Sequence, residues 1–143
     1  MNFTRLTLAA VVATIVDMIY GYVVYGVVLA AEFGRYPGVF RPMEDVTPNL
    51  LLLAAGVLVA MLALAYIYGK GYEGGSGFQE GMRFGGLVGI FGAGYVAVGN
   101  YVVMNIGRRV AVAMAVAGLV EFAVVGMTIG IMYKPAAKAS ARP

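Results

Sequence analysis

The sequence contains no cysteine, no histidine and no tryptophan. Cysteine and histidine supply the usual ligands of zinc, iron–sulfur and haem sites, so their absence argues against such sites as well as against disulfides and thiol catalysis. Nine methionines remain, but thioethers scattered through apolar helices are packing residues far more often than metal ligands. We therefore expect no catalytic residue, no metal site and no cofactor in this chain, and we expect it not to be an enzyme.

Charged residues are also scarce. They make up 12% of the chain, whereas hydrophobic residues make up 62%; a soluble domain has about a quarter charged and about half apolar residues. The net charge of +3 comes without any basic run or basic helical face, which argues against nucleic acid as a partner. The composition predicts an integral membrane protein.

Four apolar segments cover about residues 6–31, 48–68, 84–106 and 110–133. Each is near or above the roughly 20 residues that a helix needs to cross the hydrocarbon core of a bilayer. Thr47 followed by Pro48 predicts the start of the second helix, and the glycine-rich stretch 69–83 predicts a polar turn after it. We expect one integral membrane domain over residues 1–143, with an all-α fold, a four-transmembrane-helix bundle.

Four spans place both termini on one side of the membrane, and basic residues in short loops indicate which side. The side of the termini has Arg5, Lys70, Arg83, Lys134, Lys138 and Arg142, and the other side has Arg35, Arg41, Arg108 and Arg109. The excess favours cytoplasmic termini in a bacterial inner membrane.

Small residues recur at helical spacing in the third and fourth segments. Where no hydrophobic force acts between helices, such rows let two backbones approach closely. The residues that we expect to pack in this way are Gly81, Gly85, Gly89 and Ala93 in the third segment and Gly118, Gly126 and Gly130 in the fourth. The sequence leaves open whether their partner is a helix of this chain or of a neighbouring subunit.

Two acids, Asp17 and Glu121, lie near the middle of the first and fourth segments, where no lysine or arginine accompanies them. A charge at that depth costs at least about 2.5–3.5 kcal/mol, so we expect protonated carboxyls or one proton shared by the two. Thr14 and Tyr20 share the face of Asp17, and Thr128 shares that of Glu121. These five residues are either a polar contact between helices or a proton or cation site.

Five short motifs follow one another along nearly the whole chain: "YGVVL", "GVFRP", "LAYIYGK", "GFQEGMRFGGLVG" and "VEFAVVGMTIG". In these motifs and their order the chain resembles a group of small bacterial integral membrane proteins with four predicted spans and no assigned activity. The resemblance implies a four-helix membrane fold and no particular reaction.

Two functions fit these observations. The first is a non-catalytic subunit, structural or accessory, whose partners are the lipid bilayer and either other membrane proteins or a second copy of itself. The alternative is a small transporter or proton-coupled channel that uses Asp17 and Glu121. The first is favoured because transporters usually have broken helices and polar linings, whereas the second segment is apolar throughout and no proline interrupts a predicted span.

Overall fold

The computed structural model describes residues 1–133. Lys134, Lys138 and Arg142, which contributed to the count of basic residues, lie outside the described residues. Residues 1–133 form helices and connecting loops without a β-strand. Four helical spans are long and apolar enough to cross a membrane, Phe3–Val28, Met43–Gly71, Gly77–Val103 and Arg108–Met132. The predicted all-α fold with four transmembrane helices is confirmed.

The first span contains a change of helix type. Helix α1 (Phe3–Val23) begins after Asn2, whose side-chain oxygen accepts a hydrogen bond from the backbone N–H of Arg5 at 3.1 Å. It continues into the π-helical turn η1 (Val24–Val28), which the N–H of Leu29 closes by donating to the Val24 carbonyl at 2.8 Å. Each residue advances an α-helix by about 100°, so the wider π turn changes the direction of the side chains after it.

The second span begins earlier than the sequence predicts. It consists of α3 (Met43–Val46), a 3₁₀ turn η2 (Thr47–Asn49) and α4 (Leu50–Gly71). The hydroxyl of Thr47 donates to the Met43 carbonyl at 2.8 Å, so Thr47 does not cap a helix start. Pro48 therefore lies inside a helical span, contrary to the sequence prediction. Because proline has no N–H to donate, the helix passes it as a 3₁₀ turn.

The third span also begins early, at Gly77 and not near residue 84. The predicted polar turn is short because Glu80, near the start of α5 (Gly77–Gly92), bonds to it. The Glu80 carboxylate accepts hydrogen bonds from the backbone N–H groups of Glu73, at 3.2 Å, and of Gly75. Gly74 has a φ of 100°, a backbone conformation that glycine adopts without steric cost. The connection from α4 to α5 is thereby reduced to Tyr72–Ser76.

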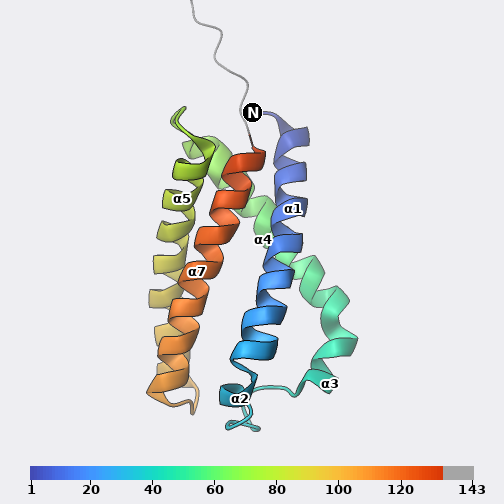
Figure 1. Ribbon diagram of the computed structural model, residues 1–143, viewed down its shortest axis with the longest axis vertical. Helices are drawn as coiled ribbons and strands as arrows, with labels where there is room; N and C mark the ends of the chain where they lie inside the picture. The colour runs from blue at the N-terminus through green and yellow to red at the C-terminus, as the bar shows by residue number, and fades with distance from the viewer. Residues whose placement is uncertain (134–143) are drawn as a thin grey trace, which may run out of the picture.

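The rest of the third span consists of a second π turn, η3 (Ala93–Ala97), and α6 (Val98–Val103), and α7 (Arg108–Met132) is the fourth span. Helices α5, α7 and α1 lie side by side, with α7 in the middle, and α4 crosses behind them at a slant (Figure 1). The start of α1 and the end of α7 lie at the same end of the bundle (Figure 1). From the short α4–α5 loop, α4 and α5 diverge along their length.

The buried residues form two clusters. The larger cluster lies where α1, α4 and α7 meet, toward the end that holds the start of the chain. It contains Leu6, Ala9, Ala10, Ala13, Met61, Ala65, Tyr68, Val125, Ile129 and Tyr133. The smaller one lies at the other end and contains Ile106, Val110 and Ala111, with partly buried Phe33, Tyr36, Val39, Phe40 and Met114 packed against it.

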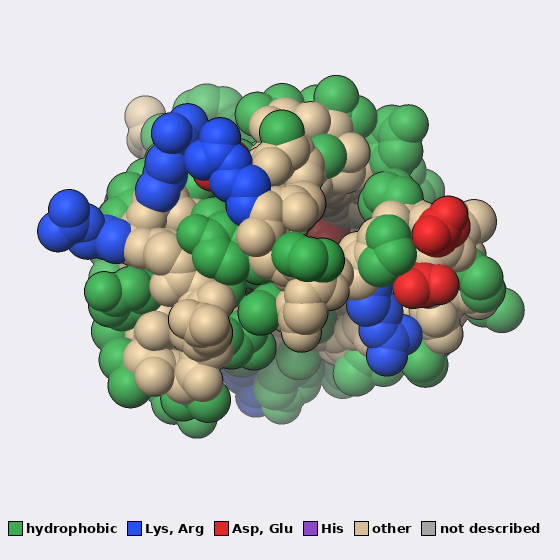
Figure 2. All heavy atoms as spheres, turned by 90° about the horizontal axis from the view of Figure 1, so that it is seen from below, with side chains coloured by type: hydrophobic (Ala, Val, Ile, Leu, Met, Phe, Trp, Pro, Cys, Tyr) green, Lys and Arg blue, Asp and Glu red, His purple; other side chains and the backbone are tan. Residues whose placement is uncertain are grey.

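The loop after the first span covers this second end of α7. Phe33 and Phe40 stack with their ring centroids 4.4 Å apart, and the Tyr36 hydroxyl accepts a hydrogen bond from the N–H of Gly107 at 3.1 Å. Glu32 pairs with Arg109 at 2.9 Å and with Arg35 at 3.4 Å. Figure 2 shows this end, with basic side chains gathered on one side and acidic side chains beside basic charge on the other.

Candidate functional site between helices α1 and α7

The closest approach of two helices lies between α5 and α7 and is made by the glycine rows. A Cβ atom on Gly81 would overlap the carbonyl oxygen of Gly126, and one on Gly130 would overlap that of Gly77. A Cβ on Gly89 would lie 2.9 Å from the Cα of Leu119. The partner of these glycines is therefore another helix of the same chain.

Of the two remaining small residues predicted for packing, Gly118 lies away from this seam. Ala93 is half-buried at the start of η3. Gly118 faces α1, since a Cβ there would lie 4.0 Å from the Tyr25 hydroxyl. The α5–α7 seam thus positions α7, and the opposite face of α7 is left for α1.

Tyrosines from the first span reach α7 at this second contact. The Tyr25 hydroxyl, in η1, donates to Oε2 of Glu121 at 2.7 Å. One helical turn before it, the Tyr20 hydroxyl donates to the carbonyl of Ala117 at 2.9 Å. The two rings meet edge to face with centroids 6.4 Å apart. These bonds link the first span to the fourth in the membrane interior.

Sequence reasoning named Tyr20 but missed Tyr25. A signal was present, because Asp17, Gly21 and Tyr25 follow one another at every fourth position, the spacing that places residues on one side of a helix. What the sequence does not show is the π turn η1 that contains Tyr25.

Asp17 lies half-buried on α1. It is close enough to Glu121 and Tyr25 to interact with them electrostatically. Within residues 1–133 its carboxyl makes no hydrogen bond. The structure therefore brings both acids into one region but gives a hydrogen-bond partner only to Glu121.

The two predicted threonines do not bond to the acids. Thr14 donates to the Ala10 carbonyl and Thr128 to the Val124 carbonyl, each at 2.8 Å. Each thus bonds to its own helix four residues back, as hydroxyls in membrane helices commonly do. Of the five residues predicted to form a polar site, Asp17, Glu121 and Tyr20 lie at the α1–α7 contact. Thr14 and Thr128 bond only within their own helices.

The arrangement has a limited chemical repertoire. A carboxyl bonded to a phenol, with a second carboxyl nearby, can exchange or share a proton, and it can hold two helices together. Across residues 1–133 there is no group of three or more histidine, cysteine or acidic residues that could hold a metal ion.

Comparisons with protein-family models, curated proteins and solved structures find no match to this chain. The resemblance to small four-span bacterial membrane proteins stays a prediction.

Proposed function

We propose that this protein is a non-catalytic subunit of the bacterial inner membrane, which works by packing against other membrane helices. The partner is a larger membrane complex, to which the chain is a structural or accessory component, or further copies of itself. The single observation that carries the proposal is an exposed row of small residues on α4, which no residue of the described chain covers.

The first turns of α4 stand away from the other helices. Leu51 is 83% exposed and Leu52 is 74% exposed, and a Cβ on Gly56 would meet no atom within 4 Å. Ala60 and Ala63 are exposed as well, and their spacing from Gly56 puts all three on one side of the helix. In the α5–α7 seam, small residues at such spacing bring two backbones together; on α4 the same kind of surface has no partner within the described chain.

The polar side chains between α1 and α7 support a structural role. Tyr20 donates to the carbonyl of Ala117 and Tyr25 donates to Glu121, so both tyrosines join the first span to α7. Hydrogen bonds between membrane helices contribute about 0.6 kcal/mol on average and up to about 1.7 kcal/mol. Groups used in this way fix the helices relative to one another and present a rigid surface to a partner.

The test is to extract the native membrane in mild detergent, separate the complexes on a native gel and identify the proteins in the band by mass spectrometry. We expect this chain in a band larger than a monomer, at fixed stoichiometry with other proteins or with itself. Gly56→Leu should shift the chain to the monomer position, because the larger side chain separates the helices. A monomer in the unmodified protein would contradict the proposal.

Gly86→Leu is the matched control. A Cβ at Gly86 also meets no atom within 4 Å, but α5 already has α7 as its close partner. The control should leave the large band unchanged. If both variants dissociate the band equally, the α4 face is not the contact.

Asp17 supports a second candidate function, a proton-coupled channel or small transporter. Its carboxyl has no hydrogen bond within residues 1–133 and lies near the Glu121–Tyr25 pair, beside a π turn. Intramembrane acids often belong to proton paths, and π turns often occur at functional sites. Purified protein in vesicles would then conduct protons, and Asp17→Asn should abolish this flux. The control Asp45→Asn, at an exposed position, should leave the flux intact. Absence of flux in the unmodified protein would reject this candidate.

We propose cytoplasmic termini on the basis of the basic residues. Six lie on the side of the termini and four on the other side. Two of those four, Arg35 and Arg109, form ion pairs with Glu32. Because acids contribute little to this rule, the proposed orientation depends on the number of basic residues in the short loops and not on these pairs.

A further inference from the structure

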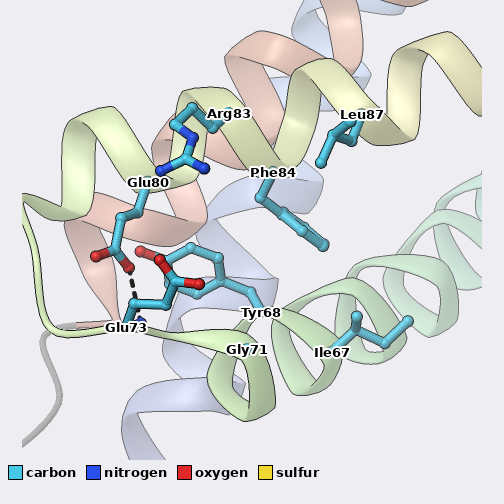
Figure 3. Close-up of a pocket in the computed structure, with 8 residues that line it drawn as sticks. All are labelled: Ile67, Tyr68, Gly71, Glu73, Glu80, Arg83, Phe84 and Leu87. Carbon is cyan, nitrogen blue, oxygen red and sulfur yellow. Dashed lines mark hydrogen bonds between the residues drawn. The ribbon is translucent and has the colours of Figure 1, made fainter.

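A pocket lies where α4 and α5 diverge from their short connecting loop. Its volume is about 210 Å³. It is lined by Ile67, Tyr68, Gly71, Glu73, Glu80, Arg83, Phe84 and Leu87 (Figure 3). These residues come from the last turns of α4, the loop and the first three turns of α5, so the pocket lies near the connected ends of two membrane spans.

The pocket contains a buried hydroxyl to which no described residue bonds. Tyr68 is 3% exposed, and its ring is held edge-on by the rings of Phe84, at 5.6 Å, and Tyr133, at 6.1 Å. Its hydroxyl makes no hydrogen bond with any of residues 1–133 and points toward the space between Glu73 and Glu80 (Figure 3). Buried polar atoms in proteins nearly always have a partner, so this hydroxyl is available to bond a molecule that enters the pocket.

Charges of both signs surround the hydroxyl. The Glu80 carboxylate is already bonded by two backbone N–H groups of the loop, but Glu73 is exposed and forms no ion pair within residues 1–133. Arg83 is exposed and likewise unpaired there. The polar rim therefore presents one free carboxylate and one free guanidinium.

The remaining wall is apolar. Ile67 and Leu87 are exposed, at 55% and 68%, and Phe84 is half-buried between them and Tyr68. Since α4 and α5 continue from here into the membrane, the apolar wall opens toward the acyl chains of the bilayer while the charged rim faces the headgroups. A ligand that fits has an ammonium, an anionic group and a hydrocarbon chain.

We propose that this pocket binds an aminophospholipid with a primary ammonium group. The ammonium donates hydrogen bonds to the Glu73 carboxylate and to the Tyr68 hydroxyl. The Arg83 guanidinium donates to the phosphate, a pairing that suits its planar array of donors. One acyl chain lies along Ile67, Phe84 and Leu87.

The test is native mass spectrometry of the full-length purified protein, titrated with phosphatidylethanolamine, phosphatidylcholine and phosphatidylglycerol of identical acyl chains. We expect phosphatidylethanolamine to bind most tightly. Phosphatidylcholine has a fully methylated ammonium group without N–H donors, and phosphatidylglycerol has a neutral glycerol group in place of the ammonium. Soluble glycerophosphoethanolamine should bind far more weakly than the lipid, because it lacks the acyl chain. Equal binding of all three lipids would overturn the proposal, as would equal binding of the soluble compound.

Three variants test the residues. Tyr68→Phe keeps the ring and removes only the hydroxyl, and it should weaken phosphatidylethanolamine about two- to tenfold, the range for one hydrogen bond. Glu73→Gln should reduce the preference for phosphatidylethanolamine over phosphatidylglycerol, and Arg83→Gln should weaken both. Because Glu73 and Arg83 are exposed, their variants keep the test valid even if Tyr68→Phe is unstable.

Tyr66→Phe and Glu44→Gln are the matched controls. Tyr66 is 45% exposed and does not line the pocket, and Glu44 is exposed at the opposite end of the bundle. Both should bind lipid as the unmodified protein does. Unchanged affinity in all three pocket variants would overturn the proposal.

Discussion

Replacing Gly85 with alanine is expected to destabilise the protein by about 2–3 kcal/mol. A Cβ at Gly85 would overlap the carbonyl oxygen of Phe122 and lie 3.0 Å from the Cα of Ala123. Carbon atoms in good contact lie about 3.5–4.0 Å apart. The obstructing atoms are backbone atoms of α7, which cannot rotate away, so α5 and α7 must separate.

The magnitude follows from the contacts that this separation weakens. A gap of about 0.5–1 Å removes about a quarter to a half of a contact energy of about 0.1–0.2 kcal/mol per atom pair. If the seam holds about as many atom pairs as one buried leucine, about 40–60, the middle of these ranges gives about 2–3 kcal/mol. Overpacked protein cores lose a similar amount, about 1–3 kcal/mol.

The assay is equilibrium unfolding by SDS in mixed micelles, followed by circular dichroism. Gly86→Ala is the control: it changes the next residue of the same helix in the same way, and its Cβ meets nothing within 4 Å. The control should be neutral or more stable by up to about 1 kcal/mol, because alanine favours helix over glycine. Equal stability of the two variants would refute the close backbone contact between α5 and α7.

Three further predictions concern the polar groups and the topology. Tyr25→Phe removes the hydrogen bond to Glu121 and should lower the free energy of unfolding by about 0.5–2 kcal/mol in the same assay. The control Tyr22→Phe, at a position that is 64% exposed, should not change it measurably. Equal effects of the two variants would mean that the bond does not form. Glu32→Gln removes the ion pairs with Arg35 and Arg109 at an end of the bundle, so it should lower the free energy of unfolding by less than about 1 kcal/mol. This decrease should become smaller as salt is added. A decrease that does not respond to salt would argue against an electrostatic origin. Because the chain has no cysteine, single cysteines report topology without background. Ser76→Cys should react with an impermeant maleimide only from the cytoplasmic side, and Gly38→Cys, in the exposed loop after the first span, should react only from the other side. The reverse pattern would refute cytoplasmic termini.

Several features of the fold could be predicted from local sequence alone. The length and spacing of the apolar segments indicate four membrane helices, because in a bilayer each backbone polar group must bond within its own helix. The ends were less predictable. Residues 77–83 were expected in a turn because glycine and polar residues are common in loops, but Glu80 bonds to the preceding loop and α5 starts at Gly77. Pro48 likewise suggested a helix start and lies within a span.

The sequence by itself determined that this chain is an all-α membrane protein, that two acids lie in its membrane interior and that glycine rows suit close helix packing. Those conclusions depend on hydrophobicity and on helical spacing, which are local properties. Only the tertiary structure decided that Gly81 and Gly85 pack on α7, that Tyr25 bonds to Glu121, and that Tyr68 points into a pocket between two diverging helices. Each of these contacts depends on how the helices are rotated and tilted relative to one another. The packing of the whole bundle, including the π turn in the first span, sets these rotations and tilts, and no single segment does so alone.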